Sequence, residues 1–376
     1  MGTNSPVGAT PLSPIIETMA LHLLAWPGAP LAILSAALFG ASTPFAKALL
    51  GGGVDPWLLA GLLYLGSGVG LGIVAGARRV AGSAPAETPL RRGDLAWLGL
   101  VVISGGIVGP VLLMVGLAAT PASTASLLLN LEGLATMAIA WRMFHENVDR
   151  RLLAGAASIL AGAAVLSWQG GPSGFGWGTA AIAGACLAWG IDNNLTRKLS
   201  AADPVQIALI KGLAAGAVNL ALAVAAGAQL PSAAAIGGAA LIGFLGYGLS
   251  LVLFVFALRY LGTARTGAYF STAPFIGAVL AVTLFGEPVT AGLMVAGLLI
   301  AAGVYLHLAE RHEHEHAHEA FAHEHRHVHD EHHQHPHEPG DPVGEPHAHP
   351  HRHLPIVHRH PHYPDLHHRH PHARAH

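Results

Sequence analysis

The sequence predicts an all-α, polytopic membrane protein with ten transmembrane helices, arranged as an inverted repeat of two five-helix units. Three observations predict this fold: an apolar composition, regularly spaced apolar segments and an internal repeat. The chain of 376 residues is 52% hydrophobic and 11% charged, whereas soluble domains are about 25% charged. Only 23 of residues 1–309 are Asp, Glu, Lys or Arg, so this part of the chain suits lipid better than water.

Ten apolar segments are found with a window of about 20 residues. In chain order they are residues 31–49, 57–77, 95–118, 122–143, 152–169, 177–197, 204–227, 234–258, 264–285 and 290–309. Short connections such as Gly51–Pro56 and Phe285–Val289 make successive helices antiparallel neighbours. Abundant Gly and Ala allow close helix packing in lipid. Residues 1–29, which precede the first segment, are expected to form an irregular lead-in.

Lysine and arginine gather in alternate connections, those between helices 2 and 3, 4 and 5, 6 and 7, and 8 and 9. They are Arg78, Arg79, Arg91, Arg92, Arg142, Arg150, Arg151, Arg197, Lys198, Arg259 and Arg265. By the positive-inside rule this side faces the cytoplasm. We therefore expect a multi-pass protein of the plasma membrane, or of the inner membrane in a Gram-negative cell, with both termini in the cytoplasm.

An internal repeat relates the two halves. Residues 122–169 match residues 263–309 at an offset of 141 residues, and Leu38–Lys47 matches Ala188–Arg197 at an offset of 150 residues. Because each copy has five helices, an odd number, the second copy must enter the membrane upside down relative to the first. Inverted repeats of this kind place a substrate site near the membrane midplane between the halves.

The helix count, the short connections and the ending of helix 9 resemble the drug/metabolite transporter superfamily, and within it the EamA-type ten-helix transporters. That ending is Pro274 followed by Gly286 and Glu287. The resemblance covers one EamA-like repeat at residues 30–170 and a second at residues 175–309. It implies secondary transport of small solutes, often organic ones, without fixing the substrate.

Six polar residues lie at bilayer depth, where a charge costs about 2.5 to 3.5 kcal/mol at a helix centre. The candidates for binding a substrate or coupling ion are Glu132, Asn130, Asp192, Asn193, Asn194 and Lys211. Glu132 lies near the midplane and is either a proton carrier or cation ligand, or a protonated group in a helix-to-helix hydrogen bond. Asp192 and Lys211 are expected to form an ion pair, which either neutralises both groups or exchanges partners with a proton or substrate.

A second set of residues is expected to act as gates or structural anchors: Glu146, Glu287, Pro274, Lys47 and Tyr269. Glu146 and Glu287 end helices 4 and 9 at opposite faces of the membrane, as the inverted repeat requires. Lys47 lies near the outer end of helix 1, where its long side chain is expected to reach water. Tyr269 belongs to a mixed face of helix 9 that suits a cavity wall.

A histidine-rich segment, residues 310–376, ends the chain, and 24 of the 27 histidines follow His307. Its low hydrophobicity and repeated prolines predict a disordered cytoplasmic tail. Neutral imidazole binds Zn, Ni, Co and Cu, so the tail is expected to bind a transition metal. The candidate ligands are His312, His314, His316, His318, His323, His325, His327, His329, His332 and His333. A pH-responsive tail is the alternative, since imidazole gains charge near pH 6.5.

Together these features predict a secondary transporter, proton-coupled, that exports a small solute or metabolite by alternating access. Two alternatives stay open: a transition-metal exporter whose tail captures cytosolic ions, and a membrane-tethered metal buffer or sensor. The expected partners are the lipid bilayer, the solute or ion, and protons, and a homodimer is compatible with the sequence. No cofactor is required, the tail metal apart. The chain has no phosphate loop, catalytic triad or basic field, so neither enzyme activity nor nucleic-acid binding is expected.

Overall fold

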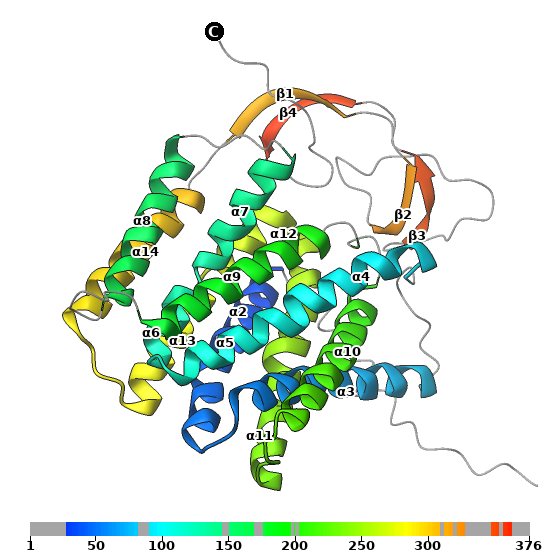
Figure 1. The fold of residues 1–376 in the computed structure, drawn as a ribbon. Helices are drawn as coiled ribbons and strands as arrows, with labels where there is room; N and C mark the ends of the chain where they lie inside the picture. Colours follow the sequence, from blue (N-terminus) through cyan, green and yellow to red (C-terminus); the bar gives the residue numbers. More distant parts are fainter. Residues whose placement is uncertain are drawn as a thin grey trace, which may run out of the picture.

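The computed structural model describes residues 28–81, 90–144, 150–168, 176–196, 199 and 203–308, together with four short strands after residue 311. Up to Leu308 the described chain is built from helices (Figure 1). Residues 1–27 of the expected N-terminal lead-in lie outside the described residues. Its last two positions, 28 and 29, belong to the first helix, which begins at Gly28.

The first repeat forms five helical paths from nine helical pieces among the described residues, and all five are long and apolar enough to cross a membrane. Helices 1, 2 and 5 are single α-helices, whereas a π-helix interrupts helix 3 and a short break divides helix 4. The elements are α2 (Gly28–Gly51), α3 (Pro56–Val80), η1 (Arg92–Asp94), α4 (Leu95–Val101), the π-helix η2 (Val102–Val108), α5 (Gly109–Ala118), α6 (Ala122–Leu128), α7 (Leu131–Phe144) and α8 (Arg150–Ser167).

The second repeat has the same plan, with one difference at helices 8 and 9. Its elements are α9 (Trp177–Thr196), α10 (Pro204–Ala225), α11 (Ala233–Ile242), the π-helix η4 (Gly243–Leu249), α12 (Ser250–Phe270), α13 (Ala273–Phe285) and α14 (Ala291–Leu308).

The predicted boundary between helices 8 and 9, residues 258–264, is wrong. The helix α12 runs through this stretch to Phe270, and the chain leaves the helix only at residues 271–272. Pro274 explains why the chain breaks at residues 271–272. Proline is favoured in the first turn of a helix, where α13 has it, and in a helix interior its missing N–H would leave a carbonyl unpaired. A helix break at residues 129–130 occupies the equivalent place in the first repeat.

Matching features on the two halves follow the repeat. The two π-helices begin at Val102 and Gly243, which are 141 residues apart. Two other helices, α3 and α10, both begin with Asp-Pro, and in each the aspartate caps the helix: Asp55 accepts the N–H of Leu58, and Asp203 accepts the N–H of Val205. The interface of α3 with α10 is the most extensive between helices, and that of α8 with α14 follows it. Each of these pairs joins a helix to its own counterpart, as a two-fold relation between the repeats requires.

Glycines allow the backbones of α3 and α10 to touch where they cross. A Cβ on Gly212 would lie 2.6 Å from the backbone nitrogen of Gly68, and a Cβ on Gly68 would lie 2.5 Å from that of Leu213. No side chain fits at such distances, so the small residues set the approach of the two halves.

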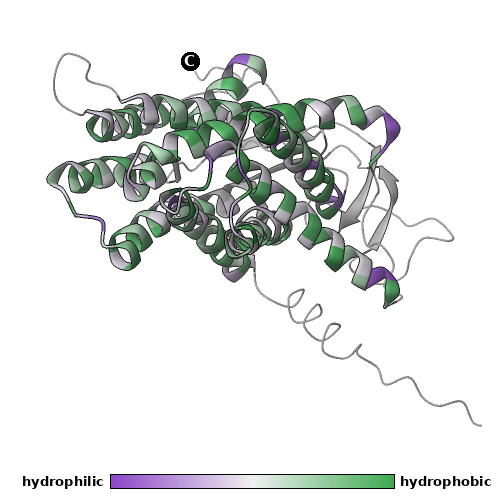
Figure 2. Cartoon of the chain, turned by 60° about the horizontal axis from the view of Figure 1, so that its bottom comes forward, coloured by the Kyte–Doolittle hydropathy of each residue, from purple (hydrophilic) through white to green (hydrophobic). Residues whose placement is uncertain are grey.

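Seven helical paths among the described residues are long and apolar enough to cross a membrane. They are Gly28–Gly51, Pro56–Val80, Arg92–Ala118, Ala122–Met143, Arg150–Ser167, Pro204–Ala225 and Ala233–Ala257. Two shorter apolar helices are found at Ala273–Phe285 and Ala291–Leu306. Figure 2 shows hydrophobic residues along most of the helices and hydrophilic ones chiefly near helix ends. The structure is thus a multi-helix membrane bundle, and the count of ten spans stays a prediction.

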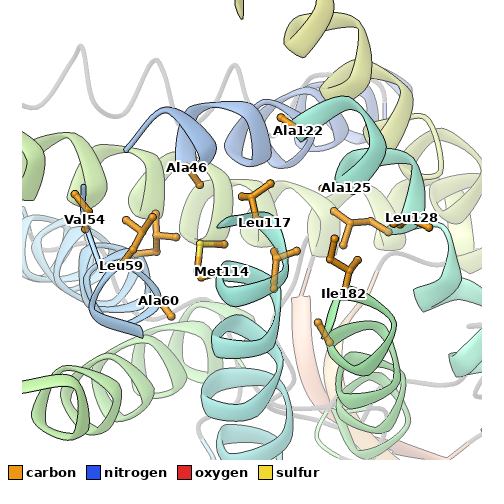
Figure 3. Close-up of a cluster of buried hydrophobic side chains, with 14 of the residues drawn as sticks. Ala46, Val54, Leu59, Ala60, Met114, Leu117, Ala122, Ala125, Leu128 and Ile182 are labelled. Carbon is orange, nitrogen blue, oxygen red and sulfur yellow. The ribbon is translucent and has the colours of Figure 1, made fainter. Parts of the chain in front are cut away.

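One end of the bundle, at the bottom of Figure 1, carries the connections 52–55, 119–121, 226–232 and 286–290. We call it the Lys47 end, because Lys47 lies in the last turns of α2. The largest apolar cluster extends to this end. Figure 3 shows part of it, with Ala46, Leu117, Ala125 and Ile182 side by side.

The histidine-rich segment contains four strands, where the sequence predicts disorder. They are β1 (His312–His318), β2 (Ala322–His327), β3 (His347–Arg352) and β4 (Ile356–His362), and they lie at the top of Figure 1. Strand β1 pairs antiparallel with β4, and β2 pairs antiparallel with β3. Histidine at every second residue has the period of a strand, and the disorder expected for the tail as a whole stays a prediction.

Candidate functional site

A buried ion pair lies between α9 and α10. The Nζ atom of Lys211 is 2.5 Å from Oδ2 of Asp192, and the two side chains are only 13% and 7% exposed. Thr196 Oγ1, one turn along α9, donates to the other carboxylate oxygen of Asp192 at 3.4 Å. The structure therefore brings together the two residues that the sequence predicts to pair.

A second carboxylate lies across the interface of α7 with α9. Glu132, in the first turn of α7, accepts a hydrogen bond at 2.9 Å from the side-chain amide of Asn193, which also donates to Thr136 Oγ1 at 3.2 Å. The two helices can approach because Gly190 has no side chain: a Cβ there would lie 2.8 Å from the Cβ of Ala135. The side chain of Asn193 is exposed, so this polar group is open on one side.

The side-chain amides of two predicted site residues donate hydrogen bonds to backbone carbonyls. Asn194 donates to the carbonyl oxygens of Gly190 and Thr136, at 2.8 and 3.1 Å. Asn130 donates its side-chain amide at 2.9 Å to the carbonyl of Leu127, which also accepts the backbone N–H of Asn130 at 3.2 Å, at the break between α6 and α7. Both amides therefore stabilise helix geometry beside the charged groups.

The π-helix η2 packs against the ion pair. A π-helix leaves carbonyl groups without their usual partners and often occurs at functional sites. Here the carbonyl oxygen of Gly105 accepts hydrogen bonds from Tyr64 Oη at 2.7 Å and from Trp189 Nε1 at 3.0 Å. The neighbouring carbonyl of Gly106 accepts one from Asn219 at 3.0 Å. A Cβ on Gly105 would overlap the carboxylate of Asp192, so only glycine leaves room for the pair.

The equivalent position in the other half has no charge. Gly246 of η4 corresponds to Gly105, and it packs against Ser42, the counterpart of Asp192. Aromatic rings gather nearby: the ring of Tyr247 lies 5.5 Å from that of Tyr64 and 6.0 Å from that of Phe39. The polar centre is therefore charged on one side and aromatic on the other.

Lys47 and Glu287 hold opposite sides of one turn at the Lys47 end. Lys47 Nζ donates to the last carbonyl oxygens of α5, those of Leu117 at 2.7 Å and Ala118 at 3.0 Å. These carbonyls at a helix end complement the charge of the ammonium. Lys47 also lines a pocket that opens at the surface, so the expectation that its side chain reaches water stays a prediction.

Glu287 accepts hydrogen bonds from the backbone N–H groups that begin α6. The N–H of Ala122 lies 2.6 Å from Oε1, and the N–H of Ser123 lies 2.8 Å from Oε2. A carboxylate at this position satisfies two donors that have no helical partner and complements the helix dipole. Its repeat counterpart, Glu146, lies outside the described residues.

The remaining predicted gate residues pack among apolar groups. Pro274 is buried at the start of α13. Tyr269 packs against a cluster that contains Leu31 and Leu253, and its carbonyl accepts a hydrogen bond from Thr272. The structure does not bring Tyr269 to the charged centre.

Sequence reasoning missed Tyr64 and Trp189, which donate to the carbonyl of Gly105, and Asn219, which donates to the carbonyl of Gly106. Asn219 could have been found, because it is a fully buried amide in an apolar helix. Tyr64 and Trp189 carry no such signal, since aromatic residues are common in membrane helices.

The predicted tail ligands are described only in part. His312, His314, His316 and His318 lie on β1, and His323, His325 and His327 lie on β2. Outside the described residues are three further candidates, His329, His332 and His333. Among the side chains that the structure does describe, no group of three His, Cys, Asp or Glu residues could hold a metal ion.

Comparison with known proteins agrees with this architecture. The family model of the EamA-like transporter family matches residues 26–168 and again residues 176–309. An uncharacterized transporter of Methanothermobacter thermautotrophicus is 27% identical over 231 residues, which cover 58% of this chain and 66% of the relative. One solved crystal structure has a similar fold, with 21% identity, a TM-score of 0.55 and coverage of 74% of this chain and 95% of that chain. Because the family model matches both halves of the bundle, the chain belongs to the EamA-like transporter family.

Proposed function

We propose that this membrane transporter is a proton-coupled exporter of a small organic solute in the plasma membrane, with the Lys47 end outside. The observation that carries the proposal is the cluster of Asp192, Lys211 and Glu132 where α7, α9, α10 and a π-helix meet. Charged groups inside a membrane protein are costly and mark substrate or ion pathways. Their place between inverted repeats suits alternating access to one site.

Glu132 is the group best suited to carry the proton. Asp192 is already neutralised by Lys211, whereas the hydrogen bond recorded for Glu132 among the described residues comes from the neutral amide of Asn193. A carboxylate with a neutral partner can take up a proton without breaking an ion pair. The Asp192–Lys211 pair is then free to exchange partners with a charged group on the solute.

The composition of the centre favours an organic solute over a bare metal cation. Lys211 would repel a metal ion, but it can bind the acidic group of a solute. On the other side of the centre, the rings of Tyr247 and Phe39 offer an apolar surface. A solute that has both a charged group and an apolar part suits these two sides.

Replacing Glu132 by glutamine is expected to uncouple transport from the proton gradient. The amide keeps an oxygen that can accept the hydrogen bond from Asn193, but it cannot take up a proton. In proteoliposomes with an imposed pH gradient, a panel of radiolabelled amino acids, amines, sugars and nucleosides is tested first with the wild type. For the solute that accumulates, we expect the variant to lose gradient-driven accumulation about ten-fold or more.

Exchange without a gradient provides the control for the Glu132 variant. Uptake of labelled solute against an internal pool of unlabelled solute requires no net proton movement, so it should persist in the variant. Gradient-driven accumulation equal to that of the wild type would assign coupling to another group. A loss of both activities would instead place Glu132 in solute binding.

A second proposal concerns the tail, which would capture transition metal on the cytoplasmic side. The strand register supports it. In the pairing of β1 with β4, His312, His314 and His316 lie opposite His362, His360 and His358. The pairing of β2 with β3 likewise places three histidines opposite histidines. Positions directly opposite in an antiparallel pair share one face, and imidazole suits Zn, Ni, Co and Cu. If the tail also passes the captured metal to the helical bundle, the protein would be a transition-metal exporter, which is the alternative function.

Removing four histidines that are paired in register is expected to weaken Zn²⁺ binding by the full-length protein about ten-fold or more. The variant is H314A/H316A/H358A/H360A, and affinity is measured by competition with a chromophoric chelator. The matched control removes four histidines outside the strands: His332, His333, His335 and His337. Equal losses in the two variants would show that the tail binds metal as an unpaired pool of imidazoles.

A further inference from the structure

The turn between α5 and α6, residues 119–121, is held from both sides by charges that come from different halves of the protein. The cation of Lys47 is on α2 of the first repeat and holds the carboxyl end of α5. The anion of Glu287 follows α13 of the second repeat and holds the amino end of α6. Each charge has the sign that complements its helix end.

Next to this turn, toward the middle of the bundle, the backbones of α2 and α13 touch, and the Ser126 side chain of α6 packs against them. A Cβ on Gly277 of α13 would lie 2.6 Å from Ser126 Oγ and 2.7 Å from the carbonyl oxygen of Gly40, and a Cβ on Gly40 would overlap the backbone of Ala273. Phe45 and Phe285 add an edge-to-face ring contact at 5.6 Å between α2 and α13. No path for a solute passes between helices packed this closely.

Apolar side chains close the space next to the turn. Ala46, Leu117, Ala122 and Ala125 are at most 1% exposed and belong to the cluster drawn in Figure 3. Above them, a pocket of about 370 Å³ opens at the surface and is lined by Lys47 and Ala118 among others.

At the opposite end of the bundle, the repeat counterparts of Glu287 and Lys47 are Glu146 and Arg197, and both lie outside the described residues. By the repeat offset of 141 residues, the start of α6 at Ala122 corresponds to residue 263. That residue lies inside the continuous helix α12, which offers no free N–H groups there. The turn that Lys47 and Glu287 hold therefore has no counterpart within α12, and the close packing of α2 with α13 closes the Lys47 end.

We infer that Lys47 and Glu287 form the latch of the outer gate, and that they position the α5–α6 turn against α2 and α13 while the polar centre is open to the other side. The inference rests on the proposed alternating access. Opening to the outside requires the turn to leave both charges, after which Gly40, Gly277 and Ser126 separate.

The test uses Ser126 as a reporter, because its side chain is only 1% exposed behind the latch. The native Cys186 is replaced by serine, Ser126 by cysteine, and the full chain is reconstituted in vesicles of known orientation. A membrane-impermeant maleimide is applied from the Lys47 side. Either Glu287→Gln or Lys47→Met should raise the labelling rate about ten-fold or more, since each removes charge-assisted hydrogen bonds. Lys47→Arg keeps the charge and the donors, so it should leave the rate near that of the parent.

A distance measurement keeps the inference testable if the reporter packs poorly. Spin labels at Ala119, on the turn, and at Val289, beyond Glu287, should give one short distance in the parent and a longer second population in Glu287→Gln. An unchanged labelling rate and an unchanged distance distribution in folded Glu287→Gln would overturn the latch. Neither result depends on solute transport, so failure of the latch is distinguishable from failure of the proposed function.

Discussion

Replacing Asp192 by asparagine should lower the free energy of unfolding by about 3 kcal/mol or more, the cost of leaving a buried charge without its partner. The Nζ atom of Lys211 lies 2.5 Å from Oδ2 of Asp192, and both side chains are nearly inaccessible. The substitution would therefore leave Lys211 without its partner in a poorly solvated place. Equilibrium unfolding of the purified protein in mixed micelles measures the change. Transport of the solute identified in the gradient assay should be lost as well, because the pair can no longer exchange partners.

The double variant D192N/K211M separates the two roles of the pair. It removes both charges, so it should recover at least half of the lost stability while transport stays absent. If the double variant is no more stable than Asp192→Asn, the loss comes from packing against Gly105 rather than from an unpaired lysine. Recovery of transport in the double variant would show that the pair only neutralises itself.

Much of the fold could be predicted from the sequence, because lipid imposes strict rules. Helices must satisfy their own backbone, so apolar segments of sufficient length mark them. The repeat was visible because both copies have small residues and polar residues at matching positions, separated by a constant offset. The Asp192–Lys211 pair was predictable for a similar reason: two opposite charges at one depth, on helices joined by a short connection, have few other partners.

Other parts of the site could not be predicted. A π-helix inserts one residue into a turn without any sequence signal, so neither η2 nor the hydrogen bonds accepted by the buried carbonyl of Gly105 were foreseen. The hydrogen bonds from Tyr64 and Trp189 depend on that carbonyl. Lys47 was expected to reach water because it lies near a helix end, and its hydrogen bonds to the last carbonyls of the neighbouring helix α5 were not foreseen.

The tail shows a further limit of composition-based reasoning. Low hydrophobicity and repeated prolines predict disorder when the segment is considered alone. The structure nevertheless pairs His312–His318 with Ile356–His362, because alternating residues can follow a strand even without an apolar core. The sequence shows the tail to be histidine-rich, and its disorder outside the paired strands stays a prediction.

Labelling of a cysteine at Asn193 tests the central claim most directly. The claim is that the polar centre lines a water-filled passage between the two halves. Asn193→Cys is made in the Cys186→Ser background, and Leu187→Cys provides the matched control, because Leu187 is an exposed apolar residue on the same helix. Maleimides react with the thiolate, which forms in water and not in lipid.

The two positions should differ clearly. A membrane-impermeant maleimide applied from the side opposite Lys47 should label Asn193→Cys about ten-fold faster than Leu187→Cys, and the Glu287→Gln latch variant should add labelling from the Lys47 side. If Asn193→Cys reacts no faster than Leu187→Cys with the water-soluble reagent, the polar centre faces lipid and not a passage, and the account fails.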